Sequence, residues 1–213
     1  MQKTTPIILI AALLFTGNVV ALEGDTIPLV APQKKGGMPL LEALDNRQSI
    51  RSFSPEELSR QDLSNLLWAA FGVNREDGRR TAPSARNWQQ FDLYLIMPGG
   101  WYVYEPNHHA LIKLGNEDLR DHAGSQAFVK TAPLNLIYVA DHDRMAGAGP
   151  ANHDFYSATD VGFISQNVYL FCASEGLATV VRGLVDRSRL HDVMKLRPSQ
   201  QVVLGQTVGY PAK

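Results

Sequence analysis

The sequence predicts an α+β fold in which helices cover a mixed sheet. Three observations support this prediction. Two β-rich runs, 91–97 and 101–104, flank Pro98-Gly99-Gly100, which is typical of an antiparallel hairpin. Residues 134–140 are nearly all apolar, as in a strand buried on both faces. Residues 154–175 carry apolar side chains at helical spacing and are followed by Gly176, which predicts a long helix.

The remaining elements follow from turn and capping signals along the chain. Residues 22–37 contain prolines and glycines without an apolar period, so we expect an extended N-terminal arm before a domain over 38–213. Further helices are predicted over 39–46, from Ser54-Pro55 to Gly72, over 107–124 and over 187–196. Further strands are predicted over 178–181 and 201–210.

Composition limits the class of protein. The chain has 213 residues, 45% of them hydrophobic, which suits one domain with a real core. Its formal net charge is −1, so it lacks the basic surface of a dedicated nucleic-acid binder. Cys172 is the single cysteine, which excludes an intrachain disulfide and a cysteine-based zinc site.

The first 21 residues resemble an export signal. Lys3 precedes an apolar run over 7–15, and Val19-Val20-Ala21 supplies small residues for cleavage near Ala21. A membrane anchor is the alternative, but the run is shorter than the roughly 20 residues that cross a bilayer. We therefore expect an exported, periplasmic protein without a stable membrane anchor.

Two polar segments could bind a ligand. Arg47-Gln48-Ser49-Ile50-Arg51 places two guanidinium groups and a hydroxyl in one turn, which suits a phosphate. Pro83-Ser84-Ala85-Arg86-Asn87 offers an amide that both donates and accepts, which suits the edge of a flavin or a base. Each segment could equally be a solvated connection between elements.

A third segment follows the longest predicted helix. Gly183, directly after Arg182, has no side chain and would let the backbone approach a planar ring closely.

In this order the segments resemble the FMN-dependent nitroreductase family. The resemblance runs from Leu40 to Pro211. Its parts are Arg47-x-Ser49-x-Arg51, Pro83-Ser84-x-x-Asn87-x-Gln89, Asp160-x-Gly162-x-x-x-Gln166-Asn167-x-x-Leu170 and Val208-Gly209-Tyr210-Pro211. The segments 66–70, 80–84 and 101–106 are most similar to the SagB-type dehydrogenase branch. That likeness is in the scaffold, because the Lys-Tyr pair of the azoline-oxidising members is absent from 144–147.

The resemblance implies a three-layer α/β/α sandwich around a mainly antiparallel sheet, a homodimer, and FMN at the subunit interface. It implies that Arg47, Ser49 and their neighbour Gln48 hold the FMN phosphate, and that Arg51 reaches the phosphate or the N1/O2 edge. It also implies that Asn87, with Pro83, Ser84 and Ala85, meets the pyrimidine edge from the partner subunit.

The same resemblance implies that the backbone at Arg182 and Gly183 meets flavin N5 and O4. Family members often clamp the phosphate with a basic residue after the last strand. Here Lys213 either serves as this clamp or the clamp is missing. The expected activity is hydride transfer to a small organic acceptor, and the alternative is a degenerate flavin-binding dimer without activity.

Metal or thiol chemistry is the less favoured interpretation. The histidines at 108, 109, 142 and 153 lack the spacing of a ligand pair on a helix, so we expect no metal site. Cys172 lies on the apolar face of the long helix, which favours a buried, inert thiol.

Overall fold

The structure is a computed structural model that describes residues 25–213. The predicted signal peptide and the first residues of the predicted arm lie outside this range. Among the described residues, no helix is long and apolar enough to cross a membrane.

A single seven-stranded sheet forms the middle layer, in the order β1-β4-β3-β2-β5-β7-β6, and all its pairings are antiparallel. The strands are β1 (Asp25–Pro28), β2 (Phe91–Met97), β3 (Gly100–Glu105), β4 (Ala110–Gly115), β5 (Leu134–Asp141), β6 (Ala178–Arg182) and β7 (Gln200–Gly209). The predicted hairpin is confirmed, because Met97 pairs with Gly100. The fully buried β5 lies between β2 and β7, as its apolar sequence predicts.

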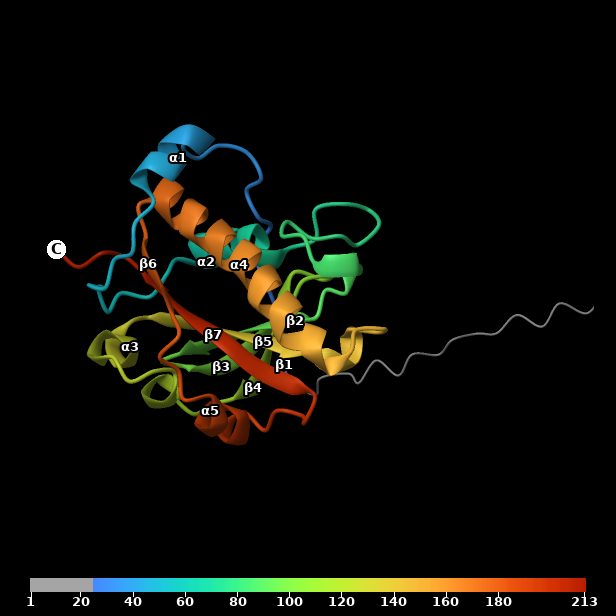
Figure 1. Cartoon of the computed structure of the whole chain (residues 1–213). Coiled ribbons are helices and arrows are strands. Elements are labelled where there is room, and N and C mark those ends of the chain that lie inside the picture. The colour runs from blue at the N-terminus through green and yellow to red at the C-terminus, as the bar shows by residue number, and fades with distance from the viewer. Residues whose placement is uncertain (1–24) are drawn as a thin grey trace, which may run out of the picture.

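Helices cover both faces of this sheet, which confirms the three-layer prediction (Figure 1). The helices are α1 (Leu40–Asn46), α2 (Arg60–Phe71), α3 (Ala127–Thr131), α4 (Pro150–Glu175) and α5 (Arg187–Val193). Buried residues of α2 and α4 form one apolar core with the sheet, and buried residues of α3 and α5 form the other. The short α1 packs against α4.

The long helix α4 is defined by its sequence at both ends. Pro150 occupies its first turn, where a missing N–H costs nothing. Gly176 ends the helix in the left-handed conformation with φ 68°, and its N–H donates to the carbonyl of Cys172. The face with Val161, Ile164 and Val168 is buried against the sheet. Each such side chain contributes about 1.5–3 kcal/mol, so this face fixes α4 firmly.

The predicted start of the second helix is wrong by several residues. The helix begins at Arg60, and the Ser59 hydroxyl caps it by accepting from the N–H of Asp62. Ser54 lies in a turn before the helix: its hydroxyl accepts from the N–H of Glu56 at 3.2 Å, and its own N–H donates to the carbonyl of Tyr210 at 2.9 Å. A contact with the C-terminal segment therefore overrides a local helix signal.

The helix predicted over 107–124 is also wrong. This region contains β4 and only a single 3₁₀ turn at Arg120–His122. Glu105 shapes the turn before β4, because its carboxylate accepts from the N–H groups of Asn107 and His108. β4 then forms a hairpin with the preceding β3 and also pairs with β1, which lies more than 80 residues earlier in the sequence, so strand pairing decides its conformation.

Candidate functional site

The first polar segment, residues 47–53, lies along the edge of the sheet that β6 forms. The N–H of Ile50 donates to the carbonyl of Thr179 in β6 at 3.0 Å. Phe53 forms an isolated β-bridge with Pro211, and the N–H of Ala212 donates to the carbonyl of Ser52 at 3.2 Å. The C-terminus therefore lies beside this segment (Figure 1). The structure thus brings Lys213 close to the turn that carries Arg47 and Arg51.

Tyr169 of α4 contacts both Arg47 and Ser49 of this turn and so fixes its position. The Arg47 guanidinium lies 5.3 Å from the centre of its ring, and the Ser49 hydroxyl lies 2.8 Å from its phenol oxygen. That oxygen also accepts from the N–H of Val181 at 2.9 Å. Because Tyr169 can then donate to Ser49, the Ser49 O–H is left to donate to an anion.

The two arginines of this turn are not paired with acidic side chains of the described residues. Within residues 25–213, neither Arg47 nor Arg51 has a carboxylate within 4.0 Å. Arg47 is half-buried and Arg51 is exposed, so both can reach a ligand. Two guanidinium groups and a hydroxyl on one turn fit the dianionic phosphate of a nucleotide-like cofactor.

Gln48 is exposed at the same turn and lines a cavity of about 220 Å³ behind the turn. Tyr169, Cys172 and Thr179 are among its other walls. Burial raises the pKa of the Cys172 thiol far above its ordinary value, which keeps the sulfur protonated and unreactive.

The second polar segment is bound to the other half of α4. The buried carboxylate of Asp160 accepts from the N–H of Ala85 at 3.0 Å and from the Gln90 side chain at 2.9 Å. The hydroxyl of Ser84 accepts from the N–H of Gln89 at 3.0 Å. Pro83 and Asn87 are exposed beside this anchor.

The backbone of this segment is unusual. Arg86, Asn87 and Gln89 all have φ values near +50°, a region that residues with a side chain seldom adopt. Such a backbone is maintained only where surrounding contacts enforce it, and it is frequent at ligand sites. The side-chain amide oxygen of Asn87 accepts from the Gln89 side-chain amide at 3.0 Å, so the NH2 group of Asn87 remains free to donate to a ligand.

One chain places these two segments at separate points along α4. Asp160 and Tyr169 are nine residues apart, which corresponds to about 14 Å along the helix axis. The structure therefore shows two exposed polar segments, each fixed to α4, and not one closed pocket.

Arg182, at the end of β6, points into the protein. It is 3% exposed, and its three donating nitrogens bond Thr207 Oγ1, the carbonyl of Ala123 and Asn135 Oδ1. Burial lowers its pKa to about 10, which leaves it charged at neutral pH. The side chain is thus occupied internally. The following Gly183 is exposed with open space beside it, so only the backbone here can meet a ligand.

Sequence reasoning missed Tyr169 and the role of Asp160. Tyr169 falls between apolar residues of a long helix, so it resembles a core aromatic. Asp160 is a buried acid in a helix, and buried acids need a partner. That rule could have identified Asp160, whereas its partner in residues 84–90 depends on the folded chain.

The histidines are dispersed among different contacts. Within the described part of the chain, no three His, Cys, Asp or Glu side chains gather as a metal site would require. His109 is bonded to Ser64 and Tyr104, and His142 stacks on His153 with 4.4 Å between ring centres.

Comparison with known proteins decides the family. The sequence model of the nitroreductase family matches residues 44–210, which include the segments at 47–51, 83–90 and 182–183. The chain belongs to the nitroreductase family. A nitroreductase-like protein of Methanocaldococcus jannaschii is 29% identical over 184 residues, which cover 82% of this chain and 92% of the relative.

Two other family members extend this comparison. A solved nitroreductase-like structure from Ralstonia eutropha is 43% identical with a TM-score of 0.84, covering 88% of this chain and 90% of that one. An FMN reductase [NAD(P)H] of Bacillus subtilis is 24% identical over 187 residues, which cover 81% of this chain and 66% of the relative. This nitroreductase-family chain is therefore an oxidoreductase.

Proposed function

We propose that this nitroreductase-family protein is an exported, FMN-dependent oxidoreductase that transfers hydride from a donor to a small organic acceptor. The turn at 47–51 carries the proposal. Two guanidinium groups that have no acidic partner among residues 25–213, and a serine hydroxyl free to donate, lie on one turn that Tyr169 contacts. The FMN reductase among the relatives supports FMN as the cofactor.

The residues present fit FMN. Arg47 and Ser49 would hold its phosphate, with Gln48 beside them, and Lys213 would approach from the adjacent C-terminus. Arg51 would reach the phosphate or the pyrimidine edge. A cation near that edge stabilises added negative charge, which is the main influence a protein has on flavin reactivity. FMN itself would accept and donate the hydride.

The remaining side chains would orient the ring system. The Asn87 amide would bond the pyrimidine edge, with Pro83, Ser84 and Ala85 forming the rest of that wall. The exposed backbone at Gly183 would face the reactive edge, and Arg182 would hold this backbone through its internal bonds.

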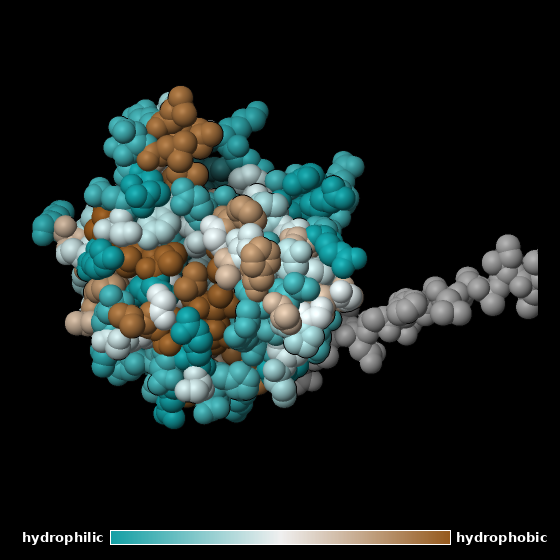
Figure 2. Space-filling view, in the orientation of Figure 1, coloured by the Kyte–Doolittle hydropathy of each residue, from teal (hydrophilic) through white to brown (hydrophobic). Residues whose placement is uncertain are grey.

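We further propose a homodimer in which each subunit completes the other's site. The two polar segments of one chain lie at separate points along α4, and a second copy would bring its own polar segment to the other side of the cofactor. Large apolar side chains are exposed on α1 and α4: Leu40, Leu41, Leu44, Phe155 and Phe163. The apolar surface over α1 stands out in Figure 2. A surface of this kind is typical of an interface.

Export and the electron donor are linked in this proposal. The segment over 1–21 indicates a periplasmic protein, and NAD(P)H is a cytoplasmic metabolite. We therefore expect slow or absent turnover with NADPH. The likeness to the SagB-type branch remains a prediction from the sequence motifs.

The test begins with a visible spectrum of the purified protein. We expect a yellow protein that releases FMN on denaturation. Arg47→Ala should weaken FMN retention roughly tenfold or more, because a charge-assisted bond contributes about 1.5–3 kcal/mol. Arg189→Ala is the matched control, since Arg189 is an exposed arginine outside the site. Equal retention in both variants would mean that the phosphate binds elsewhere.

An anaerobic titration then tests the donor. Rapid bleaching of bound flavin by micromolar NADPH would contradict the proposal of a different donor. The second candidate function is a degenerate flavin-binding dimer without activity. A yellow protein that no donor reduces would support this candidate, and a colourless protein unable to take up FMN would exclude both.

A further inference from the structure

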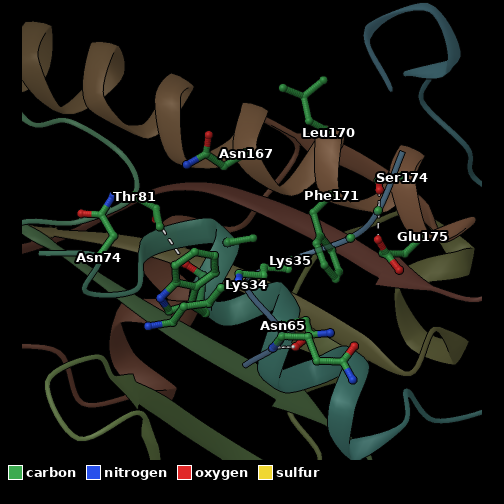
Figure 3. Close-up of a pocket in the computed structure, with 15 residues that line it drawn as sticks. Lys34, Lys35, Asn65, Asn74, Thr81, Asn167, Leu170, Phe171, Ser174 and Glu175 are labelled. Atoms are coloured by element: carbon green, nitrogen blue, oxygen red, sulfur yellow. Dashed lines mark hydrogen bonds between the residues drawn. The ribbon is translucent and has the colours of Figure 1, made fainter. Parts of the chain in front are cut away.

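A second cavity lies away from the proposed flavin site. It measures about 430 Å³ and lies between residues 33–37, α2 and α4. Figure 3 shows Asn74 and Thr81 at one end and Ser174 and Glu175 at the other. None of the residues assigned above to FMN lines it. Its size is in the range of small-molecule sites.

The irregular segment over 33–37 forms one wall of this cavity and is held at both ends by hydrogen bonds. The N–H of Gln33 donates to Asn65 Oδ1 at 2.8 Å, and the N–H of Met38 donates to Ser174 Oγ at 2.8 Å. Between these anchors Gly36 and Gly37 have φ values of 106° and 78°. A Cβ on Gly37 would lie 2.7 Å from Ser174 Oγ, so glycine is required for this close approach.

The floor of the cavity is aromatic and rigid. The Trp68 indole N–H donates to the carbonyl of Val73 at 3.0 Å, which fixes the plane of its ring. Phe171 lines the cavity from α4, with Leu170 beside it. A fixed indole face beside a second aromatic ring favours a flat aromatic ligand.

Two lysines, Lys34 and Lys35, line the cavity beside these aromatic rings. The Lys34 ammonium lies 5.2 Å from the centre of the Trp68 ring. Within the described residues, neither Lys34 nor the neighbouring Lys35 has a carboxylate within 4.0 Å. The one acid of the cavity, Glu175, accepts from the Ser174 hydroxyl at 2.9 Å. Two ammonium groups are thus available to a ligand's anion.

From these contacts we infer a binding site for a small planar aromatic carboxylate, with its ring on Trp68 and its carboxylate on Lys34 and Lys35. The inference does not depend on FMN, because the cavity and the flavin segments share no residue. Phosphate alone lacks the ring, and a neutral aromatic lacks the charge, so both should bind more weakly.

Isothermal titration of the FMN-loaded protein with benzoate tests the inference. We expect saturable binding that weakens about tenfold or more in the double variant Lys34→Gln/Lys35→Gln, since each lost ionic bond costs about a factor of ten. Benzamide and inorganic phosphate should bind at least about tenfold more weakly than benzoate. The control is Lys113→Gln, because Lys113 also lies over an aromatic ring, Tyr102.

Arg51→Gln distinguishes this site from the flavin site. If benzoate occupies the cavity, its affinity falls in the double lysine variant and is unchanged in Arg51→Gln. Tryptophan fluorescence gives a second measurement, because quenching by benzoate should disappear in Trp68→Phe while Trp88 and Trp101 remain. No binding to the unaltered protein, unchanged affinity in the lysine variant, or an equal loss in Lys113→Gln would overturn the inference.

Discussion

Removing the Asp160 carboxylate should release residues 84–90 from α4. Asp160 is 2% exposed and accepts from the N–H of Ala85 and from the side chain of Gln90. Its removal leaves both donors without an acceptor in the interior. The strained backbone at Arg86 and Asn87 then loses the anchor that holds it.

The expected magnitude follows from the two bonds. A hydrogen bond to a charged group contributes about 1.5–3 kcal/mol, so two give roughly 3–6 kcal/mol. Part of this is recovered, because the N–H of Ala85 can reach water once the turn opens. We therefore expect Asp160→Ala to lower the free energy of unfolding by about 2–4 kcal/mol. Asp160→Asn keeps one acceptor oxygen and should cost less.

Urea unfolding measures this loss. With a slope of about 2 kcal/mol per molar, the midpoint should fall by about 1–2 M without a change in slope. Asp154→Ala is the control, because Asp154 is an exposed acid on the same helix, and its cost should stay within about 0.5 kcal/mol. If the two variants unfold at the same midpoint, Asp160 does not anchor the segment.

Three further outcomes follow from buried polar groups. Burial lowers the pKa of His109 below its ordinary value of 6.5, so the stability it contributes is present above that pH and is lost as the pH falls through the lowered pKa. The hydrogen-exchange protection factors of residues 25–30, which correct for the intrinsic exchange rate at each pH, should therefore fall at pH 5, and fall less in His109→Gln. Cys172, 1% exposed, should resist thiol reagents in the native protein and react fully in urea, and fast native labelling would contradict its burial. Arg182→Met strands three internal acceptors and should lower the unfolding free energy by about 2–4 kcal/mol in the same urea assay, whereas an unchanged midpoint would show that those acceptors find other partners.

The sequence predicted elements whose signal is local. β2 has the predicted bounds, and α4 ends at Glu175 before Gly176 as expected, because an apolar pattern and a left-handed glycine act within a few residues. β4 could not be predicted this way. Its residues pair with the neighbouring β3 on one side and with β1, from the start of the described chain, on the other, and the polar residues of this region mask that strand in the sequence.

The candidate site could be proposed from residue types in the sequence, whereas its geometry required the fold. Arg47, Ser49 and Arg51 could be selected because two guanidinium groups and a hydroxyl in five residues suit an anion. Nothing in the sequence indicated that Tyr169 would support them from 120 positions past Ser49. The buried direction of Arg182 also required the fold, because it depends on acceptors from β5, β7 and the turn before α3.

The helix α4 links these findings. Tyr169 positions the turn at 47–51, Asp160 positions the segment of Asn87, and the rigid helix holds these two anchor residues about 14 Å apart along its axis. Since Phe155 and Phe163 are exposed on this helix, a second copy docking there would be set against both segments at once. Disrupting Asp160 should therefore weaken FMN retention even though Asp160 is placed in no contact with FMN, and Phe163→Ser should weaken both dimer formation and retention together. If Phe163→Ser gave a monomer with undiminished FMN retention, one chain would suffice to bind FMN and the need for a second copy would be refuted.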